Sequence, residues 1–327
     1  MRKKFFFALL SVVCFSWRAS AQSSLLATLN HEGTISTYYG SSALQEAYNA
    51  ANHGDVITLS SGSFLGTDIK KAITLRGAGM TIDTVAHTEP TVISSNFNID
   101  VSDTLSHRLT MEGIYSNQTV TVSTLKNAMF LKCRFKNVNY TSNSSTMKDL
   151  NFIHCRIAEG FNLATNGSAS FLNCVVMNPY QYSSETSVFS FTNCYVNNIN
   201  MGHSEYKNCI INHRYSGTST TTYYNNLWLS SNSSSLSSPN KTNVKISPDD
   251  ERVSFLNVDY NDDNDYQLTD AVRALIKGTD GTEVGIYGGS LPYDPTPTNP
   301  QITKFNVAAK STADGKLSVD IEVNSAN

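Results

Sequence analysis

The sequence Phe152-Ile153-His154-Cys155-Arg156-Ile157 is one copy of a short motif that decides the fold of this 327-residue chain. The motif runs aromatic, any residue, polar, Cys, any residue, apolar. Four further copies have the same form: Phe130–Phe135, Phe171–Val176, Phe191–Val196 and Tyr206–Ile211. Two degenerate copies, Thr110–Tyr115 and Tyr224–Leu229, place Gly113 and Leu227 in the Cys position.

The Cys position recurs at residues 113, 133, 155, 174, 194, 209 and 227, so neighbouring copies are 15 to 22 residues apart. Such a period indicates stacked supersecondary units, each unable to bury its apolar face alone. On a straight strand the aromatic residue, the Cys and the final apolar residue cannot all face inward, because strand period is two. We therefore expect a bend just before Cys. That position is Asn in four copies, and Asn tolerates the left-handed backbone of such a bend: Asn173, Asn193, Asn208 and Asn226.

Five of the six cysteines share this one register, and the sixth is Cys14. An exported chain normally pairs its cysteines as disulfides. An odd number in a single register instead favours a buried column of thiols, stacked turn on turn. No Cys-x-x-Cys or Cys/His pair stands at ligand spacing, so no metal site is predicted among them.

The first 21 residues have the layout of a secretory signal. A basic start precedes the apolar run Phe5–Val13, and the small residues Ala19-Ser20-Ala21 offer a cleavage site. A lipoprotein signal at Cys14 is the alternative, although Val13 stands where a small residue is wanted. We expect a secreted, periplasmic or cell-surface protein. No later run is long enough to span a membrane, so no membrane span is expected.

The charge of the chain argues against a nucleic-acid partner. Four of the 24 Lys and Arg residues lie in the leader, which contains no acid, so the mature charge is 20 − 27 = −7. A nucleic-acid-binding surface needs a basic face.

Residues 41–52 predict a helix with an apolar face formed by Leu44, Ala47, Tyr48 and Ala51. Two short predicted strands follow, at 55–59 and 73–77. This order, with Gly-Asp-Val-Ile-Thr-Leu and then Ile-Thr-Leu-Arg-Gly, resembles the start of pectin-lyase-like right-handed parallel β-helices. In that family the helix covers the open end of the coil. Leucine-rich repeats have a similar spacing, but their chain usually returns through helix, whereas the return segments here are rich in Ser, Thr and Asn.

The predicted fold is all-β: a right-handed parallel β-helix (solenoid) over residues 22–291, with roughly ten to twelve rungs. The helix at 41–52 caps its N-terminal end, and residues 255–289 resemble closing rungs of secreted β-helix proteins. Residues 292–300 form a Pro-rich linker. Residues 301–327 predict a β-hairpin around Asp314-Gly315, either a short appendage capping the coil or the start of a small β domain. We expect a monomer.

Side chains flanking each inward Cys should point outward. On two adjacent rungs they form a candidate catalytic patch of Lys132, Arg134, His154 and Arg156. This patch is similar to the face used by β-helix polysaccharide lyases, in which a cation neutralises a uronate and a basic side chain removes a proton. The alternative is a solvated face whose charges pair with Glu112 and Glu159. The recognisable motifs of hydrolases and pectate lyases of this fold are missing, which argues against an enzyme.

Aromatic residues further along are candidates for stacking on sugar rings: Tyr195, Trp228, Tyr215 and Tyr223. Their alternative role is to cover loop cores. The acidic stretch 259–270 partly mimics a calcium loop but lacks its Gly and its closing Glu. We therefore expect no cofactor, with calcium as the alternative.

Three functions remain open on this sequence. The preferred one is a non-catalytic protein that binds polysaccharide or a cell-surface glycan along its outer face. The second is a divergent polysaccharide lyase acting on an acidic glycan through the basic patch. The third is a structural, adhesin-like surface protein.

Overall fold

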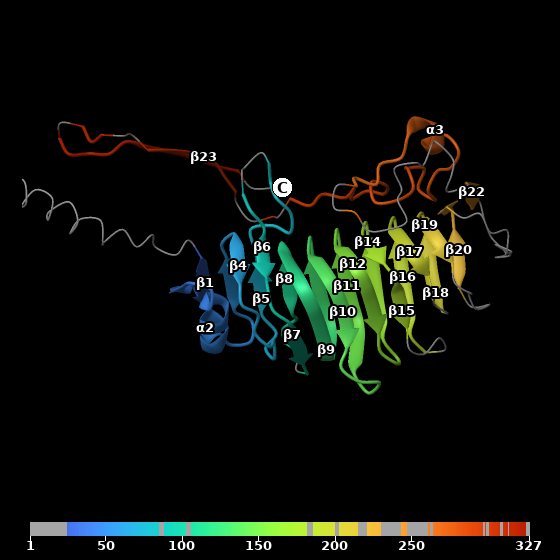
Figure 1. Ribbon diagram of the computed structural model, residues 1–327, viewed down its shortest axis with the longest axis horizontal. Helices are drawn as coiled ribbons and strands as arrows, with labels where there is room; N and C mark the ends of the chain where they lie inside the picture. Colours follow the sequence, from blue (N-terminus) through green and yellow to red (C-terminus); the bar gives the residue numbers. More distant parts are fainter. Residues whose placement is uncertain are drawn as a thin grey trace, which may run out of the picture.

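The computed structural model describes residues 25–84, 88–102, 106–181, 186–199, 203–214, 221–229, 243–246, 261, 264–296, 298, 301–307, 310–312 and 314–324. These residues form a parallel β-solenoid of about eight turns, with about 50% strand and 5% helix (Figure 1). The predicted β-helix is confirmed. The predicted signal peptide lies outside the described residues.

The N-terminal end of the coil is covered as predicted. Strands β1 (Leu26–His31) and β2 (Thr34–Tyr39) form an antiparallel pair, and β1 also pairs antiparallel with β3 (Val56–Leu59). Helix α2 (Ala43–Ala50) packs on them. It buries Ala43, Leu44, Ala47 and Tyr48, which lie on one face of the helix.

The coil has three faces, and the long strand β9 (Ile114–Leu131) contributes to all of them. The first, which we call the aromatic face, stacks β3, β5 (Thr74–Arg76), β8 (Thr110–Glu112), the end of β9, β11 (Thr146–Ile153), β13 (Ser168–Leu172), β16 (Val188–Thr192), β18 (Ser204–Lys207) and β20 (Thr222–Tyr224).

The second face follows the bend. It stacks β4 (Gly62–Phe64), β6 (Thr91–Ile93), the start of β9, β10 (Arg134–Tyr140), β12 (Arg156–Leu163), β14 (Val175–Met177), β17 (Tyr195–Ile199), β19 (Ile210–Arg214), β21 (Leu227–Leu229) and β22 (Val244–Ile246). The third, which we call the amide face, stacks β7 (Phe97–Val101), the middle of β9, the ends of β10 and β12, and β15 (Pro179–Gln181).

The aromatic residues of the motif stack inside the coil, as the repeat predicts. Successive ring centroids lie 4.5 to 5.3 Å apart, close to the strand spacing of about 4.8 Å, along Phe130, Phe152, Phe171, Phe191, Tyr206 and Tyr223. The expected bend is also present. The residue before Cys has a positive φ of 50 to 56° in all five Cys copies: Lys132, His154, Asn173, Asn193 and Asn208.

The two degenerate copies are aligned one residue differently from the prediction. Tyr115 pairs with Arg134, so Ile114 stands beside Cys133, and Gly113 (φ +63°) forms the bend. At the other end Leu227 pairs with Ile210, which places Asn226 beside Cys209. The prediction that Gly113 and Leu227 occupy the Cys position is therefore wrong, because the left-handed residue fixes the register.

The cysteines form a hydrogen-bonded ladder. All five are buried and free, and each Sγ of the later four contacts the carbonyl of the aromatic residue one turn earlier, as in Cys155 to Phe130 (3.3 Å) and Cys174 to Phe152 (3.4 Å). Asn226 continues the series, donating from Nδ2 to the carbonyl of Tyr206 at 3.0 Å. Burial raises the pKa of the Cys174 thiol, which keeps it a donor.

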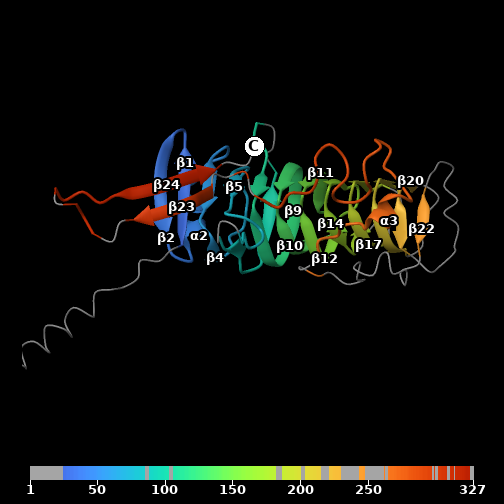
Figure 2. The same ribbon diagram turned by 90° about the horizontal axis from the view of Figure 1, so that it is seen from above.

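Residues 264–296, which we call the strap, differ most from the prediction. Residues 255–289 were expected to close the coil as further rungs. Of these, 264–289 form no strand and their only regular element is α3 (Asp270–Arg273), whereas 255–260, 262 and 263 lie outside the described residues. The strap runs along the outside of the coil, from the β22 end back toward β9 (Figures 1 and 2). The coil therefore has fewer turns than expected.

Beyond the strap, β23 (Gln301–Val307) and β24 (Val319–Asn324) form the predicted antiparallel hairpin, as a separate two-stranded sheet. Within the described part of the chain, no helix is long and apolar enough to cross a membrane.

Candidate functional site

The structure brings the predicted basic patch together, but beneath the strap. Lys132 and His154 occupy the bend on adjacent turns, and Arg134 pairs in register with Arg156. Lys132, His154 and Arg156 are only 6%, 3% and 7% exposed. The expectation that these side chains face solvent is wrong, because the strap covers this edge of the coil.

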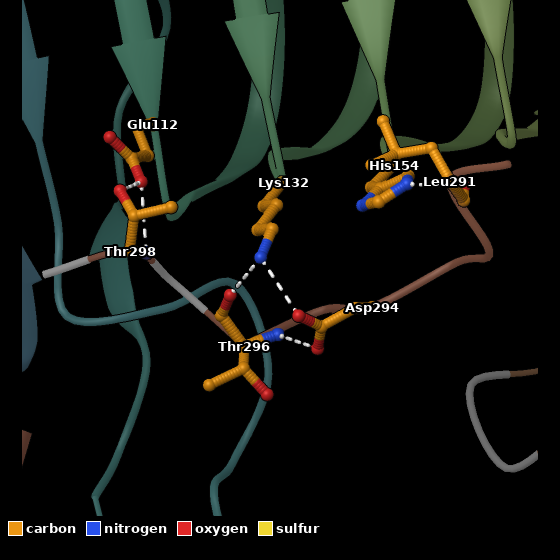
Figure 3. A network of polar contacts seen from close by, with 7 residues as sticks. All are labelled: Glu112, Lys132, His154, Leu291, Asp294, Thr296 and Thr298. Atoms are coloured by element: carbon orange, nitrogen blue, oxygen red, sulfur yellow. Dashed lines mark hydrogen bonds and ion pairs between the residues drawn. The ribbon is translucent and has the colours of Figure 1, made fainter. Parts of the chain in front are cut away.

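Lys132, His154 and Arg156 each have a partner on the strap. Lys132 Nζ forms an ion pair with Asp294 Oδ2 at 2.9 Å and also donates to the carbonyl of Thr296 (Figure 3). His154 Nε2 lies 3.1 Å from the carbonyl oxygen of Leu291. Arg156 Nε donates to Tyr293 Oη at 2.8 Å. The patch therefore holds the strap in place.

Of the flanking charged residues, Glu112 also contacts the C-terminal part of the chain, whereas Arg134 and Glu159 have partners on the coil. Glu112 Oε1 accepts hydrogen bonds from the backbone N–H and the hydroxyl of Thr298 (Figure 3). Arg134 stacks on Tyr115, with its guanidinium carbon 4.1 Å from the ring centroid. Glu159 pairs with Lys136 at 3.6 Å and not with the patch.

The bend asparagines anchor the rest of the strap. Asn173 Nδ2 donates to the carbonyls of Ile286 (2.7 Å) and Gly288 (2.8 Å). Asn208 Oδ1 accepts from the N–H of Thr279 at 2.8 Å. As the coil residues advance from 112 to 208, their partners fall from 298 to 279, so strap and coil axis run in opposite directions. A Cβ at Gly289 (φ +80°) would lie 2.2 Å from Asn193 Nδ2, and glycine is required for this close approach.

Apolar packing completes the contact. The residues one after Cys were expected to face solvent, but Val175 and Ile210 are fully buried, as is Leu227, which the one-residue shift places in the same column. They form a second core outside the coil, together with strap residues Tyr266, Leu268, Val272, Ile276, Val284 and Ile286. The outer side of the second face is therefore buried from β14 to β22.

The electrostatics of the Asp294 contact favour the ion pair. Partial burial acts to raise the pKa of Asp294, but hydrogen bonds from Lys132 Nζ and the Thr296 N–H outweigh it and lower that pKa.

A catalytic base must reach the proton that it removes. With Lys132 and His154 directed at strap atoms, a catalytic role for either would require the strap to leave.

The predicted sugar-stacking aromatics are also buried where they are described. Tyr195, Trp228 and Tyr223 are 0%, 2% and 3% exposed. Tyr195 packs against Tyr266 of the strap, with ring centroids 4.6 Å apart. Trp228 faces into the coil, 5.0 Å from the Tyr223 ring, because the one-residue shift moves it to an inward position. Tyr215 lies outside the described residues.

The predicted calcium loop, residues 259–270, is described at 261 and 264–270, whereas 259, 260, 262 and 263 lie outside the described residues. Among the residues that are described, no group of three or more His, Cys, Asp or Glu side chains could hold a metal ion.

The amide face carries a polar column that sequence reasoning missed. Its members stand in register on five adjacent turns: Asn98, Thr121, Asn139, Asn162 and Tyr180. The first four are partly exposed, and Tyr180 is 39% exposed. Asn162 Nδ2 donates to Asn139 Oδ1 at 3.2 Å, and Thr121 Oγ1 donates to Asn98 Oδ1 at 3.3 Å. The sequence did contain a sign of this column. Asn139 and Asn162 are 23 residues apart, close to the 22 residues between Cys133 and Cys155, so both asparagines follow the repeat.

Comparison with protein-family models, with curated proteins and with solved structures finds no match for this chain. Its surfaces alone therefore carry the functional argument.

Proposed function

We propose that this protein is a non-catalytic β-solenoid that binds polysaccharide along its amide face. The observation that carries the proposal is the in-register column from Asn98 to Tyr180. Its five residues repeat at the strand spacing of about 4.8 Å, so the column extends for about 19 Å along the coil axis. A repetitive polymer would meet a repetitive surface.

The chemistry of the column suits sugar hydroxyls. An amide side chain has two donors and a carbonyl acceptor with two lone pairs. The carbonyl oxygens of Asn98 and Asn139 each accept two hydrogen bonds already, so their N–H groups are the sites left for sugar hydroxyls. The bond between Asn162 and Asn139 also fixes both side chains before a ligand arrives, which lowers the entropy lost on binding. Tyr180 adds an exposed ring with a polar tip, on which a sugar ring can stack.

The lyase alternative receives less support. Its basic patch is occupied by Asp294, Thr296, Leu291 and Tyr293 of the C-terminal segment. We expect no increase in ultraviolet absorbance from unsaturated uronate ends when the protein is incubated with acidic polysaccharides, with or without Ca²⁺.

We also propose that the protein is exported and that its coil belongs with the pectin-lyase-like β-helices. The signal-like pattern of residues 1–21 supports export. The order of helix α2, then β3 and β5, supports the relationship to that family, because a helix covering the first turn followed by short parallel strands is the arrangement which that resemblance implies.

Isothermal titration against a panel of soluble polysaccharides tests the binding proposal. We expect Tyr180→Ala and the double variant Asn139→Ala/Asn162→Ala each to weaken binding about tenfold, or about 1.4 kcal/mol. Tyr39→Ala is the matched control, because Tyr39 is 53% exposed on the edge strand β2. If wild type binds nothing on the panel, a structural role replaces binding. If the variants bind like wild type, the ligand lies on another face.

A further inference from the structure

A second open feature lies beside the amide face, where the chain turns onto the aromatic face. It is a cleft of about 310 Å³, which we call the lysine cleft. Its walls are Lys126, Lys148, the 143–146 turn, Thr165 and Asn166. The turn between β10 and β11 lies at the lower edge of the coil in Figure 1, away from the strap at the upper edge.

The two lysines form an unneutralised cationic pair. Lys126 of β9 and Lys148 of β11 are register partners on adjacent turns, and both are exposed. Within the described part of the chain neither side chain has an ion pair or a hydrogen bond. The other stacked cations behave differently, since Arg134 lies on Tyr115 and Arg156 bonds Tyr293. Their strands are about 4.8 Å apart, so the two ammonium groups extend from neighbouring positions on adjacent turns and repel each other.

The turn that lines the cleft beside the lysines is held by its own hydrogen bonds. Ser145 Oγ accepts from the N–H of Ser142 at 3.1 Å and lies 3.0 Å from Thr141 Oγ1. Thr141 Oγ1 lies 3.1 Å from Ser123 Oγ, which donates to Asn98 Oδ1 at 3.2 Å. This chain of contacts links the lysine cleft to the first member of the amide column, so one ligand could occupy both.

We infer that the lysine cleft binds the acidic group of a polysaccharide, a carboxylate or a sulfate, whose neutral part lies on the amide face. An anion between the two ammonium groups removes their repulsion and gains charge-assisted hydrogen bonds. The hydroxyl and amide groups of Ser144, Thr165 and Asn166 surround the cations with partners for sugar hydroxyls. This inference rests on the proposed function and specifies its ligand as an acidic glycan.

The test uses polymers matched in backbone and differing in charge. Polygalacturonate is compared with its methyl ester, and dextran sulfate with dextran, by titration calorimetry at low salt. We expect wild type to bind at least one acidic polymer about tenfold more tightly than its neutral counterpart, and Lys126→Gln/Lys148→Gln to remove that preference. The two pairs of polymers distinguish carboxylate from sulfate.

Lys70→Gln/Lys277→Gln is the control variant. Both lysines are exposed, and this variant loses two positive charges, as Lys126→Gln/Lys148→Gln does. It should retain the preference. If Lys126→Gln/Lys148→Gln also retains it, the cleft assignment is overturned while binding along the amide face stands. Equal binding of acidic and neutral polymers by wild type overturns the acidic specificity alone. If wild type binds none of the four polymers and no polymer of the wider panel, both proposals are overturned.

Discussion

At the scale of single residues, the position before Cys has two roles. Its left-handed backbone turns the chain from one face to the next, and its side chain reaches the strap. Lys132 and His154 adopt this conformation with φ of 51° and 53°, which is uncommon for residues other than Gly, although Asn, Asp and His adopt it more often than the rest. The bend could be predicted from the recurring Asn. The anchoring role could not, because each partner lies more than 70 residues away in the sequence.

The one-residue error at Leu227 has a chemical reason. Matching by apolar character places Leu in the Cys position, whereas the ladder requires a side chain that donates a hydrogen bond. Asn226 meets that need, because it donates to the Tyr206 carbonyl and accepts from the Cys209 N–H at 2.8 Å.

This ladder role predicts unequal effects of two substitutions. Asn226→Leu leaves the buried Cys209 N–H and the Tyr206 carbonyl without these bonds, and should lower the free energy of unfolding by about 2–4 kcal/mol. Asn226→Cys restores a donor to Tyr206 and should cost about half as much. Urea unfolding of both variants measures the difference. Equal losses would show that size matters at this position and hydrogen bonding does not.

At the scale of elements, the strap replaces the expected closing rungs. The sequence did contain a sign of it. Val175-Val176-Met177 and Leu227-Trp228-Leu229 are continuously apolar, as in strands buried on both faces. This pattern predicts that something covers the outer face. It does not identify the cover, since residues 264–296 contain no repeat and their one regular element, α3, is only four residues long.

Removing either partner of the Lys132–Asp294 ion pair should have unequal effects. Lys132 is 8% exposed at its side chain and Asp294 is 47% exposed. Asp294→Ala therefore leaves a buried ammonium unpaired and should destabilise by about 1–3 kcal/mol, more than Lys132→Met, which leaves a solvated carboxylate. Thermal unfolding and limited proteolysis within the strap report the two effects. A larger loss in Lys132→Met would mean that the lysine stem, and not its charge, holds the strap.

The same ion pair predicts a pH dependence. The folded pKa of Asp294 is lowered from its ordinary value of 3.8. Its contribution to stability is therefore present above the unfolded value and disappears as pH falls through the lower folded value. We expect the melting-temperature difference between wild type and Lys132→Met to be constant above about pH 5 and to shrink between about pH 4 and 3. A difference that persists at pH 3 would contradict the assignment.

At the scale of the whole molecule, the repeat accounts for the coil and the strap decides which surfaces remain free. The motif predicted the inward aromatic stack and the bend, and the apolar periodicity of residues 41–52 predicted the cap helix, because each depends on local spacing. It misplaced the site, because exposure of the outward columns depends on a segment distant in sequence. Lys126 and Lys148 each stand seven residues before a motif Cys, so the repeat contained this alternative site, which the more conspicuous Arg and His residues obscured.

The strap should therefore act as a clamp on the coil, and its removal gives the last prediction. A chain ending at Asp263 would expose Val175, Ile210 and Leu227, each worth up to about 1.5–3 kcal/mol of burial. We expect it to bind the dye ANS, to melt at a lower temperature and to aggregate. A chain ending at Thr298 is the control, since it keeps the strap and removes only β23 and β24, and it should melt within a few degrees of wild type. Because turns of a solenoid contact mainly their neighbours, the loss should also make unfolding less cooperative, which calorimetry detects as a broader transition. A sharp, unshifted transition in the shorter chain, without dye binding, would show that the coil holds itself together and that the strap only covers it.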